Sequence, residues 1–201
     1  MIKAAITGNT ACGKSVCEKI LQEAGFKVID CDKINADLIL YSEDVKNEIA
    51  AAFGTGVLTE KGAVSKQKLA SFAFNSPDSS RNRRVLENIM HPKIWRKIEE
   101  FFDENKNEQI VFVSAALIFE AGWNNKFDKI MFISADKNTR LKRLMQRCGI
   151  NKETALKRIS AQKDEEDKIK KSDIVIYNNA DLESFKKNIH QAVISLSAEL
   201  I

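Results

Sequence analysis

Residues Gly8-Asn9-Thr10-Ala11-Cys12-Gly13-Lys14-Ser15 follow the pattern G-x-x-x-x-G-K-S, close to the start of the chain. The apolar run at 2–7 predicts a buried strand, and residues 16–24 predict a helix that ends at Gly25. A strand, a loop with a glycine at each corner and a helix, in this order, form a phosphate-binding loop, or P-loop. The backbone N–H groups of such a loop and the N-terminus of its helix attract an anion.

The side chains of this loop suggest their own roles. Lys14 can reach the β and γ phosphates of a nucleotide, and the Ser15 hydroxyl can bind Mg²⁺. Gly8 and Gly13 leave room for phosphate to approach. Because Cys12 lies at a helix N-terminus within an anion site, we expect a lowered thiol pKa and reaction with alkylating agents unless ATP covers it. The alternative is a small side chain that fits the loop and stays buried.

The composition is that of a globular protein without an evident macromolecular partner. The 201 residues are 44% hydrophobic and 30% charged, which is enough for one well-buried domain with an insertion. The net charge is +4 with both signs interspersed, so neither nucleic acid nor membrane is an expected partner. We expect no membrane span and no signal peptide. Four cysteines without metal-ligand spacing, and only two histidines, predict reduced thiols in the cytoplasm and no structural zinc.

Strand and helix patterns alternate over most of the chain, which predicts an α/β domain with a parallel sheet. The expected strands after the first lie at 26–30, 109–114, 129–134 and 173–177. The expected helices of this part lie at 136–147, after the capping residue Asn151, and from Leu182 to the C-terminus.

The alternation stops between the second and third strands. Helical spacing there predicts helices at 45–53, 65–74 and 79–102. Pro92 lies inside the last of these, so we expect that helix to kink or restart near His91. The whole pattern predicts a P-loop nucleotide-kinase-like fold, with a doubly wound parallel five-stranded sheet. It forms one domain over 1–201, with a helical insertion at about 42–105 and a helical lid at about 140–170.

Ligands of open parallel sheets bind beyond the carboxyl ends of the strands, and several polar residues are expected there. Asp30 and Asp32 close the second strand, where a carboxylate could accept a proton from an attacking hydroxyl and help to hold Mg²⁺. The alternative role for either is a helix N-cap. Ser114 ends the third strand, where many P-loop enzymes have an acidic residue, so the metal is expected to rest on Ser15, water and Asp32. Glu120 is the nearest later carboxylate, or else a plain surface charge.

Basic residues follow the fourth strand. Arg140, Arg143 and Arg147 share one helix face by their spacing, and Arg158 lies on the next helix. Such a row can neutralise charge on a transferring phosphoryl group and close the site against water, or it can be a solvated basic face. His91 is similarly open to two interpretations, a ligand contact or a structural side chain.

Taken in order, these pieces resemble the dephospho-CoA kinase family along nearly the whole chain. The motifs that carry the resemblance are the P-loop, Ile29–Asp32, Met90–Pro92, Leu117–Glu120, Arg143–Arg147, Arg158–Gln162 and Asp173–Asn178. The sequence departs from the family at Asn9, Ala11 and Cys12, where glycine is more usual, at Val16 in place of Thr, and at Ala116 in place of Pro.

The resemblance implies that ATP phosphorylates the ribose 3′-hydroxyl of dephospho-CoA, giving coenzyme A and ADP. It implies that Asp32 is the catalytic base, that Lys14 and Arg143 are catalytic, and that Ser15 and Asp32 bind Mg²⁺. The helical insertion at about 42–105 would line the acceptor site, with the acceptor-binding residues Asp32, His91, Glu120 and Arg143. Asn178 would lie near the adenine. The residues implied for ATP are Gly8, Asn9, Thr10, Ala11, Cys12, Gly13, Lys14, Ser15, Val16, Arg147 and Asn178.

Two other functions stay open at this point. One is a P-loop kinase that acts on a nucleoside or nucleotide, although the helical insertion and the His-Pro pair argue against it. The other is a nucleotide-binding regulator or nucleic-acid-binding module without chemistry, against which the dispersed charge and the few Trp and Tyr residues argue. The expected partners are ATP and dephospho-CoA, and the chain is expected to be a monomer or a weak homo-oligomer.

Overall fold

The computed structural model describes residues 1–74, 76–161 and 165–198. The chain divides into two compact units, Met1–Ile29 with Phe102–Ile201, and Asp30–Phe101. Residues 162–164 of the expected lid, among them Gln162 of the family motif, lie outside the described residues. The end of the expected last helix, at 199–201, lies outside them as well.

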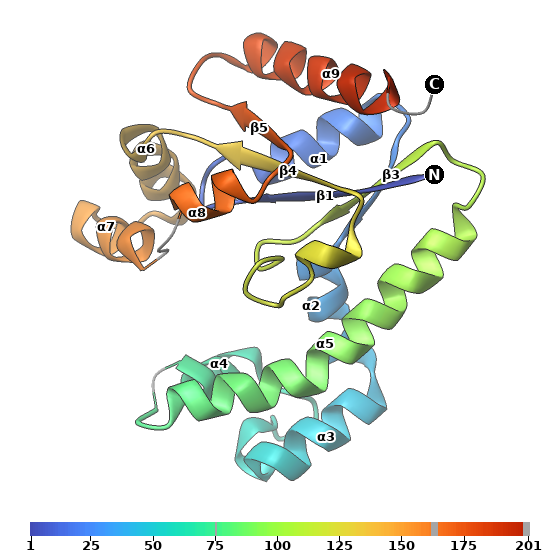
Figure 1. Ribbon diagram of the computed structural model, residues 1–201. Coiled ribbons are helices and arrows are strands. Elements are labelled where there is room, and N and C mark those ends of the chain that lie inside the picture. The colour runs from blue at the N-terminus through green and yellow to red at the C-terminus, as the bar shows by residue number, and fades with distance from the viewer. Residues whose placement is uncertain (75, 162–164, 199–201) are drawn as a thin grey trace. The chain divides into compact units, whose positions relative to one another are not determined.

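The first unit is built on a parallel sheet, shown in Figure 1. Within the described residues, its five strands are β1 Ile2–Gly8, β2 Lys27–Asp30, β3 Ile110–Ser114, β4 Lys129–Ser134 and β5 Ile174–Tyr177, in the order β2-β3-β1-β4-β5. In the register, Ile2 pairs with Ile110 of β3, and Ala4 pairs with Lys129 of β4. This confirms the predicted five-stranded parallel sheet.

The strand order places β1 in the middle of the sheet. After β1 the chain builds β2 and β3 on one side, and then β4 and β5 on the other. The carboxyl end of β1 is therefore the point where the direction of winding reverses, which is where open α/β sheets bind ligands. Six of the seven residues of β1 are buried, as expected of the central strand of a parallel sheet. The P-loop follows this strand directly.

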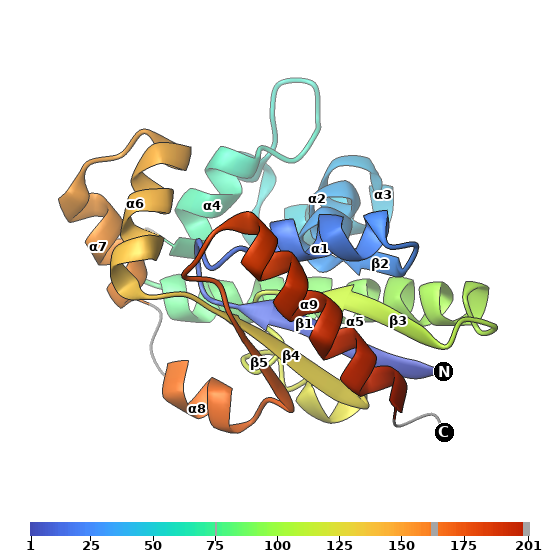
Figure 2. The same ribbon diagram turned by 90° about the horizontal axis from the view of Figure 1, so that it is seen from above.

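The described part of the first unit also contains helices. They are α1 Lys14–Glu23, α6 Lys137–Cys148, α7 Lys152–Ser160, α8 Glu165–Lys170 and α9 Leu182–Ala198, with a 3-10 turn η2 at Asn124–Lys126. Figures 1 and 2 show α1 and α9 on the same face of the sheet. Leu21 of α1 and Ile189 of α9 are fully buried there with Phe112 of β3. This core fixes the start of α1 beside the end of β1.

The second unit is helical. Its elements are α2 Cys31–Tyr41, α3 Glu43–Phe53, a 3-10 turn η1 at Thr55–Val57, α4 Lys66–Phe74 and α5 Ser79–Glu104, whose last residues belong to the first unit. One isolated antiparallel bridge joins Leu58 to Val64. Lys93 of α5 forms a 2.8 Å ion pair with Glu48 of α3. The expected role of this segment in acceptor binding stays a prediction.

The helix α5 passes through Pro92 without a break. The expected restart near His91 therefore does not occur, and the alternative, a kink there, stays a prediction. Proline removes one backbone hydrogen bond, but Met90, Ile94 and Ile98 on either side of it are buried, and this burial outweighs the local loss.

Candidate active site

The P-loop is shaped by its backbone. Gly13 has a φ of 107° and Ala11 a φ of 62°, so the chain turns twice through the left-handed region before α1 begins at Lys14. The N–H of Cys12 donates to the Asn9 carbonyl at 3.1 Å and closes the turn between them. A Cβ on Gly8 would overlap the carbonyl of Ile133 in β4, so this position requires glycine.

Two features make this loop suitable for an anion. In the described part of the chain, no side chain caps the N-terminus of α1, so the positive end of the helix faces the loop. Asn9 is 4% exposed, and its Nδ2 is a buried donor without a hydrogen-bond partner among the described residues. A buried donor of this kind is stabilised by an acceptor, and a phosphate oxygen is one.

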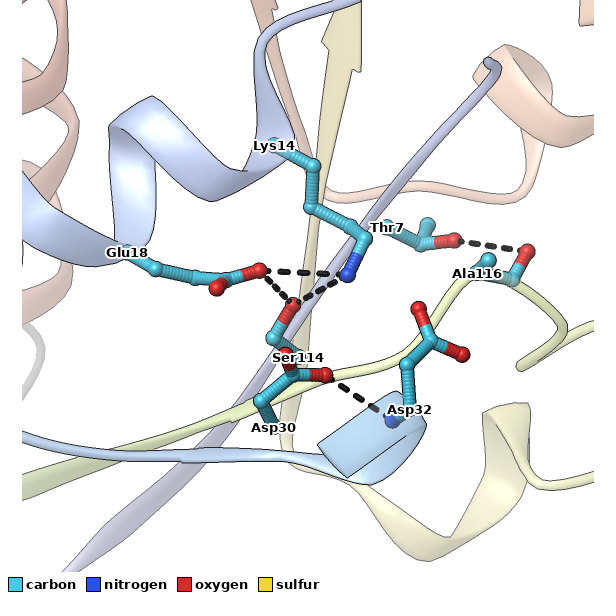
Figure 3. Close-up of polar contacts among 7 residues, drawn as sticks. All are labelled: Thr7, Lys14, Glu18, Asp30, Asp32, Ser114 and Ala116. Atoms are coloured by element: carbon cyan, nitrogen blue, oxygen red, sulfur yellow. Dashed lines mark hydrogen bonds and ion pairs between the residues drawn. The ribbon is translucent and has the colours of Figure 1, made fainter. Parts of the chain in front are cut away.

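Lys14 is held at the carboxyl end of β3, as Figure 3 shows. Its Nζ donates to Ser114 Oγ at 2.7 Å and to Glu18 Oε1 at 3.1 Å. Ser114 Oγ donates in turn to Glu18 Oε1 at 2.5 Å. The sequence identified Lys14 and singled out Ser114, but it did not identify Glu18.

The burial of Cys12 gives its thiol a pKa that differs from the expected one. It is 1% exposed, and burial raises the pKa of its thiol to about 11, although the charges of Arg140 and Lys14 act in the opposite direction. The prediction of a lowered pKa is wrong because desolvation of the thiolate outweighs the positive surroundings, and slow alkylation is expected instead. The alternative, a small side chain buried in the loop, is the arrangement found.

Arg140 joins the loop to α6 and α8. Its Nε donates to the Thr10 carbonyl at 3.0 Å, and its Nη1 forms a 2.7 Å ion pair with Glu165 Oε2. The side chain of Arg140 is almost completely buried, so it is not part of a solvated basic face. Its hydrogen bond to the Thr10 carbonyl helps to fix the backbone of the P-loop.

Arg143 and Asn178 bind another carbonyl of the loop, two residues further along the chain. Arg143 Nη1 donates to the Cys12 carbonyl at 3.5 Å, and Asn178 Nδ2 donates to the same oxygen at 2.8 Å. Arg143 Nη2 also donates to Asn178 Oδ1 at 3.2 Å. Arg147, one turn further along α6, is exposed. Arg143 and Asn178 therefore both contact the P-loop backbone. The catalytic and acceptor-binding role expected of Arg143 and the adenine contact expected of Asn178 stay predictions.

Glu120 follows the end of β3 and is paired with a lysine. Its Oε1 lies 2.5 Å from Nζ of Lys168 in α8, whose side chain is buried. A buried ammonium needs such a partner. Glu120 is thus not an isolated surface charge, and Lys168 is a partner that the sequence did not indicate.

The remaining candidates belong to the second unit. Asp30 is the N-cap of α2, because its Oδ1 accepts from the N–H of Asp32 at 2.9 Å, as Figure 3 shows. Asp32 is exposed in the first turn of this helix. His91 lies in α5, where partial burial lowers the pKa of its imidazole against the opposing effect of Glu87.

The described residues contain no group of three or more His, Cys, Asp or Glu side chains that could hold an ion. The exposed Ser15 hydroxyl, directly after Lys14 at the start of α1, fits Mg²⁺ that arrives with a nucleotide, because phosphate oxygens and water then supply most ligands. Across the described ranges, no helix is long and apolar enough to cross a membrane.

Fold and loop together define a P-loop kinase. A shikimate kinase from Bacteroides thetaiotaomicron shares the fold, with a TM-score of 0.54 at 14% identity over 97% of this chain and 98% of that chain. The chain belongs to the dephospho-CoA kinase family, whose model matches residues 2–184.

Individual relatives agree with this family. A dephospho-CoA kinase from Fusobacterium nucleatum is 36% identical over 186 residues, which cover 92% of this chain and 94% of the relative. The structure of a dephospho-CoA kinase from Campylobacter jejuni matches with a TM-score of 0.71 and 30% identity, over 99% of this chain and 98% of that one. The protein is thus a kinase that transfers phosphate to a hydroxyl group, in a family that performs the last step of coenzyme A biosynthesis.

Proposed function

We propose that the protein transfers the γ-phosphoryl group of ATP to the ribose 3′-hydroxyl of dephospho-CoA, with the P-loop as the ATP site. The observation that carries the assignment is the loop itself. An uncapped helix N-terminus, a buried Asn9 donor and the Lys14 ammonium meet at the end of the central strand. Family membership supports dephospho-CoA as the acceptor.

The residues in and beside the loop are proposed to bind the phosphates of ATP and to stabilise their negative charge. Lys14 stabilises the negative charge of the transferring phosphoryl group, and the backbone of residues 8–16 binds the phosphates. Arg143 contributes positive charge beside the loop, while its bonds to Asn178 and the Cys12 carbonyl hold the guanidinium in place. Arg147 is proposed as an exposed lid residue that contacts ATP on closure, and Asn178 as a contact near the adenine.

Asp32 is proposed as the general base for the 3′-hydroxyl. The structure supports a difference between the two aspartates, since Asp30 is engaged as the helix cap and Asp32 is exposed in the first turn. A carboxylate in this role accepts the hydroxyl proton as phosphorus is attacked. His91 and Glu120 are proposed to contact the acceptor.

Mg²⁺ is proposed to be held by Ser15 and Asp32 together with phosphate oxygens and water. When bound, it neutralises charge between the β and γ phosphates. We also propose a cytoplasmic location, which suits the buried thiols of Cys12, Cys17 and Cys31, and a monomeric or weakly associating state, which light scattering would test.

The direct test is mass spectrometry of dephospho-CoA after incubation with the protein, ATP and MgCl₂. The expected product is heavier by one phosphoryl group, at the 3′ position. Lys14→Ala should lower turnover by at least about 10²-fold, as loss of an electrostatic catalyst does. Lys19→Ala, on the exposed face of the same helix, is the matched control. Unchanged dephospho-CoA, with phosphate found on a nucleoside instead, would contradict the acceptor proposed here.

A further inference from the structure

Glu18 is a carboxylate at the phosphate site that the reaction described so far does not use. It is 8% exposed, and charged side chains are rarely buried to this extent unless they are paired. Its partners are the Lys14 ammonium at 3.1 Å and the Ser114 hydroxyl at 2.5 Å. These contacts lie within the first unit and connect α1 to the end of β3.

In each of the hydrogen bonds among these three groups, the donor and the acceptor can be assigned. Lysine can only donate, so Ser114 Oγ uses a lone pair for Lys14 and its single proton for Glu18. The carboxylate accepts from both, which closes a triangle. Because each group limits the orientation of the other two, Glu18 restricts where Lys14 Nζ can lie.

Helix stability does not explain this pair. On a helix surface, Glu four residues before Lys is the favourable order, and here Lys14 precedes Glu18. The gain from an exposed pair of this kind is also small. The side chains of both residues are only 11–12% exposed, so the carboxylate is held where desolvation is costly.

The position of Ser114 suggests a function for Glu18. Many P-loop enzymes have an acidic residue at the end of this strand, where it organises the phosphate and metal site. Here β3 ends in serine, and a carboxylate from α1 reaches its hydroxyl instead. We propose that Glu18 supplies from α1 the carboxylate that the end of β3 lacks, as a positioning residue that holds Lys14 for phosphoryl transfer.

This inference rests on the phosphoryl transfer proposed above, and two assays separate the two claims. ADP release with dephospho-CoA measures the full reaction. We expect slow ATP hydrolysis without an acceptor to depend on Lys14 and not on the identity of the acceptor. It therefore reports on Lys14 even if the proposed acceptor is wrong. The variants are Glu18→Gln, Glu18→Ala and the double variant Glu18→Ala/Ser114→Asp. Glu23→Gln, exposed on the same helix, is the matched control.

Glu18→Gln keeps the size and hydrogen-bonding capacity of the side chain but removes its charge. We expect kcat to fall by about 10–100-fold in both assays, with a smaller change in KM for ATP, because the interaction matters most in the transition state. Glu23→Gln should stay within about twofold of the parent protein. The double variant, which moves the carboxylate back to β3, should recover at least about tenfold of the kcat lost in Glu18→Ala.

The recovery is the readout that a merely structural role of Glu18 would not produce. The inference is overturned if folded Glu18→Gln keeps kcat within about twofold of the parent protein. It is equally overturned if the folded double variant is no more active than Glu18→Ala. If Glu18→Gln is unfolded at the assay temperature, the comparison of kcat between the double variant and Glu18→Ala decides whether Glu18 positions Lys14. Absence of ADP release from the parent protein with dephospho-CoA contradicts the proposed acceptor instead, and hydrolysis then decides the role of Glu18.

Discussion

Cys12 lies near the positive charges of Arg140 and Lys14, and its thiol still keeps its proton at neutral pH. Burial raises its thiol pKa to about 11, against an ordinary value of 9.0, so the thiolate is scarce at neutral pH. We expect iodoacetamide to label Cys12 at least about tenfold more slowly than the exposed Cys148 at pH 8, and its labelling to accelerate as the pH rises toward 11. Peptide mapping by mass spectrometry measures both sites in one sample. Equal labelling rates at Cys12 and Cys148 would contradict the burial of the Cys12 thiol.

Gly13 is a second residue whose backbone geometry leads to a testable prediction, here about stability. Its φ of 107° disfavours any side chain, and a Cβ there would overlap the Asn178 amide. We expect Gly13→Ala to lower the free energy of unfolding by about 2–4 kcal/mol, the sum of backbone strain and overpacking. Urea unfolding of the parent protein and the variant measures this difference in the free energy of unfolding.

Gly149 provides the control for Gly13, because its φ is also positive, at 61°, while a Cβ there would have no neighbour within 4 Å among the described residues. Gly149→Ala should therefore cost only about 1 kcal/mol, the strain alone. Equal losses for the two variants would show that the close approach of Asn178 is unimportant.

At the scale of elements, the start of α2 separates two aspartates. Asp30 caps the helix through its side chain, and asparagine caps as well as aspartate does, so Asp30→Asn should change both stability and turnover little. Asp32→Asn should lower turnover by roughly 10²–10⁴-fold, the usual contribution of a positioned base, and leave ATP binding nearly unchanged. Coupled ADP-release kinetics and a thermal melt of each variant are the measurements. A more damaging effect of Asp30→Asn than of Asp32→Asn would reject the assignment of the base.

Most elements could be predicted because their pattern of apolar residues repeats with a helix or strand period. The strand at 109–114 and the helix from Leu182 follow this rule, and the structure has β3 at Ile110–Ser114 and α9 from Leu182. The short helix α8 could not be predicted, since Glu165–Lys170 carries almost only charges. It is held by tertiary ion pairs, Arg140 with Glu165 and Glu120 with Lys168.

The same distinction applies to the site. Lys14 and Ser15 belong to a contiguous motif, so the sequence was enough to indicate them. Glu18 is buried only because β3 brings Ser114 to it, across 96 residues of chain. Cys12 was assigned the wrong pKa because burial, unlike charge, is invisible in the local sequence. Residues whose role depends on distant partners are the ones that sequence patterns miss.

At the scale of the whole molecule, the two units should respond to different ligands. The P-loop and the Arg143–Asn178 pair lie in the first unit, while His91 and the cap of α2 lie in the second. MgATP binds only the folded state, so at about 100 times its Kd it should stabilise the protein by about 2.7 kcal/mol. Hydrogen exchange shows where that stabilisation is located.

We therefore expect MgATP alone to slow exchange mainly at residues 8–20 and in α6, and dephospho-CoA to add protection in α5 around His91. The physical reason is that phosphates order the loop backbone directly, whereas the acceptor is proposed to contact the helical unit. Lys14→Ala is the control, because it should lose most of the MgATP protection and keep the exchange pattern of the unliganded protein. Protection by MgATP confined to Asp30–Phe101 would place the nucleotide in the helical unit and reject the P-loop as its site.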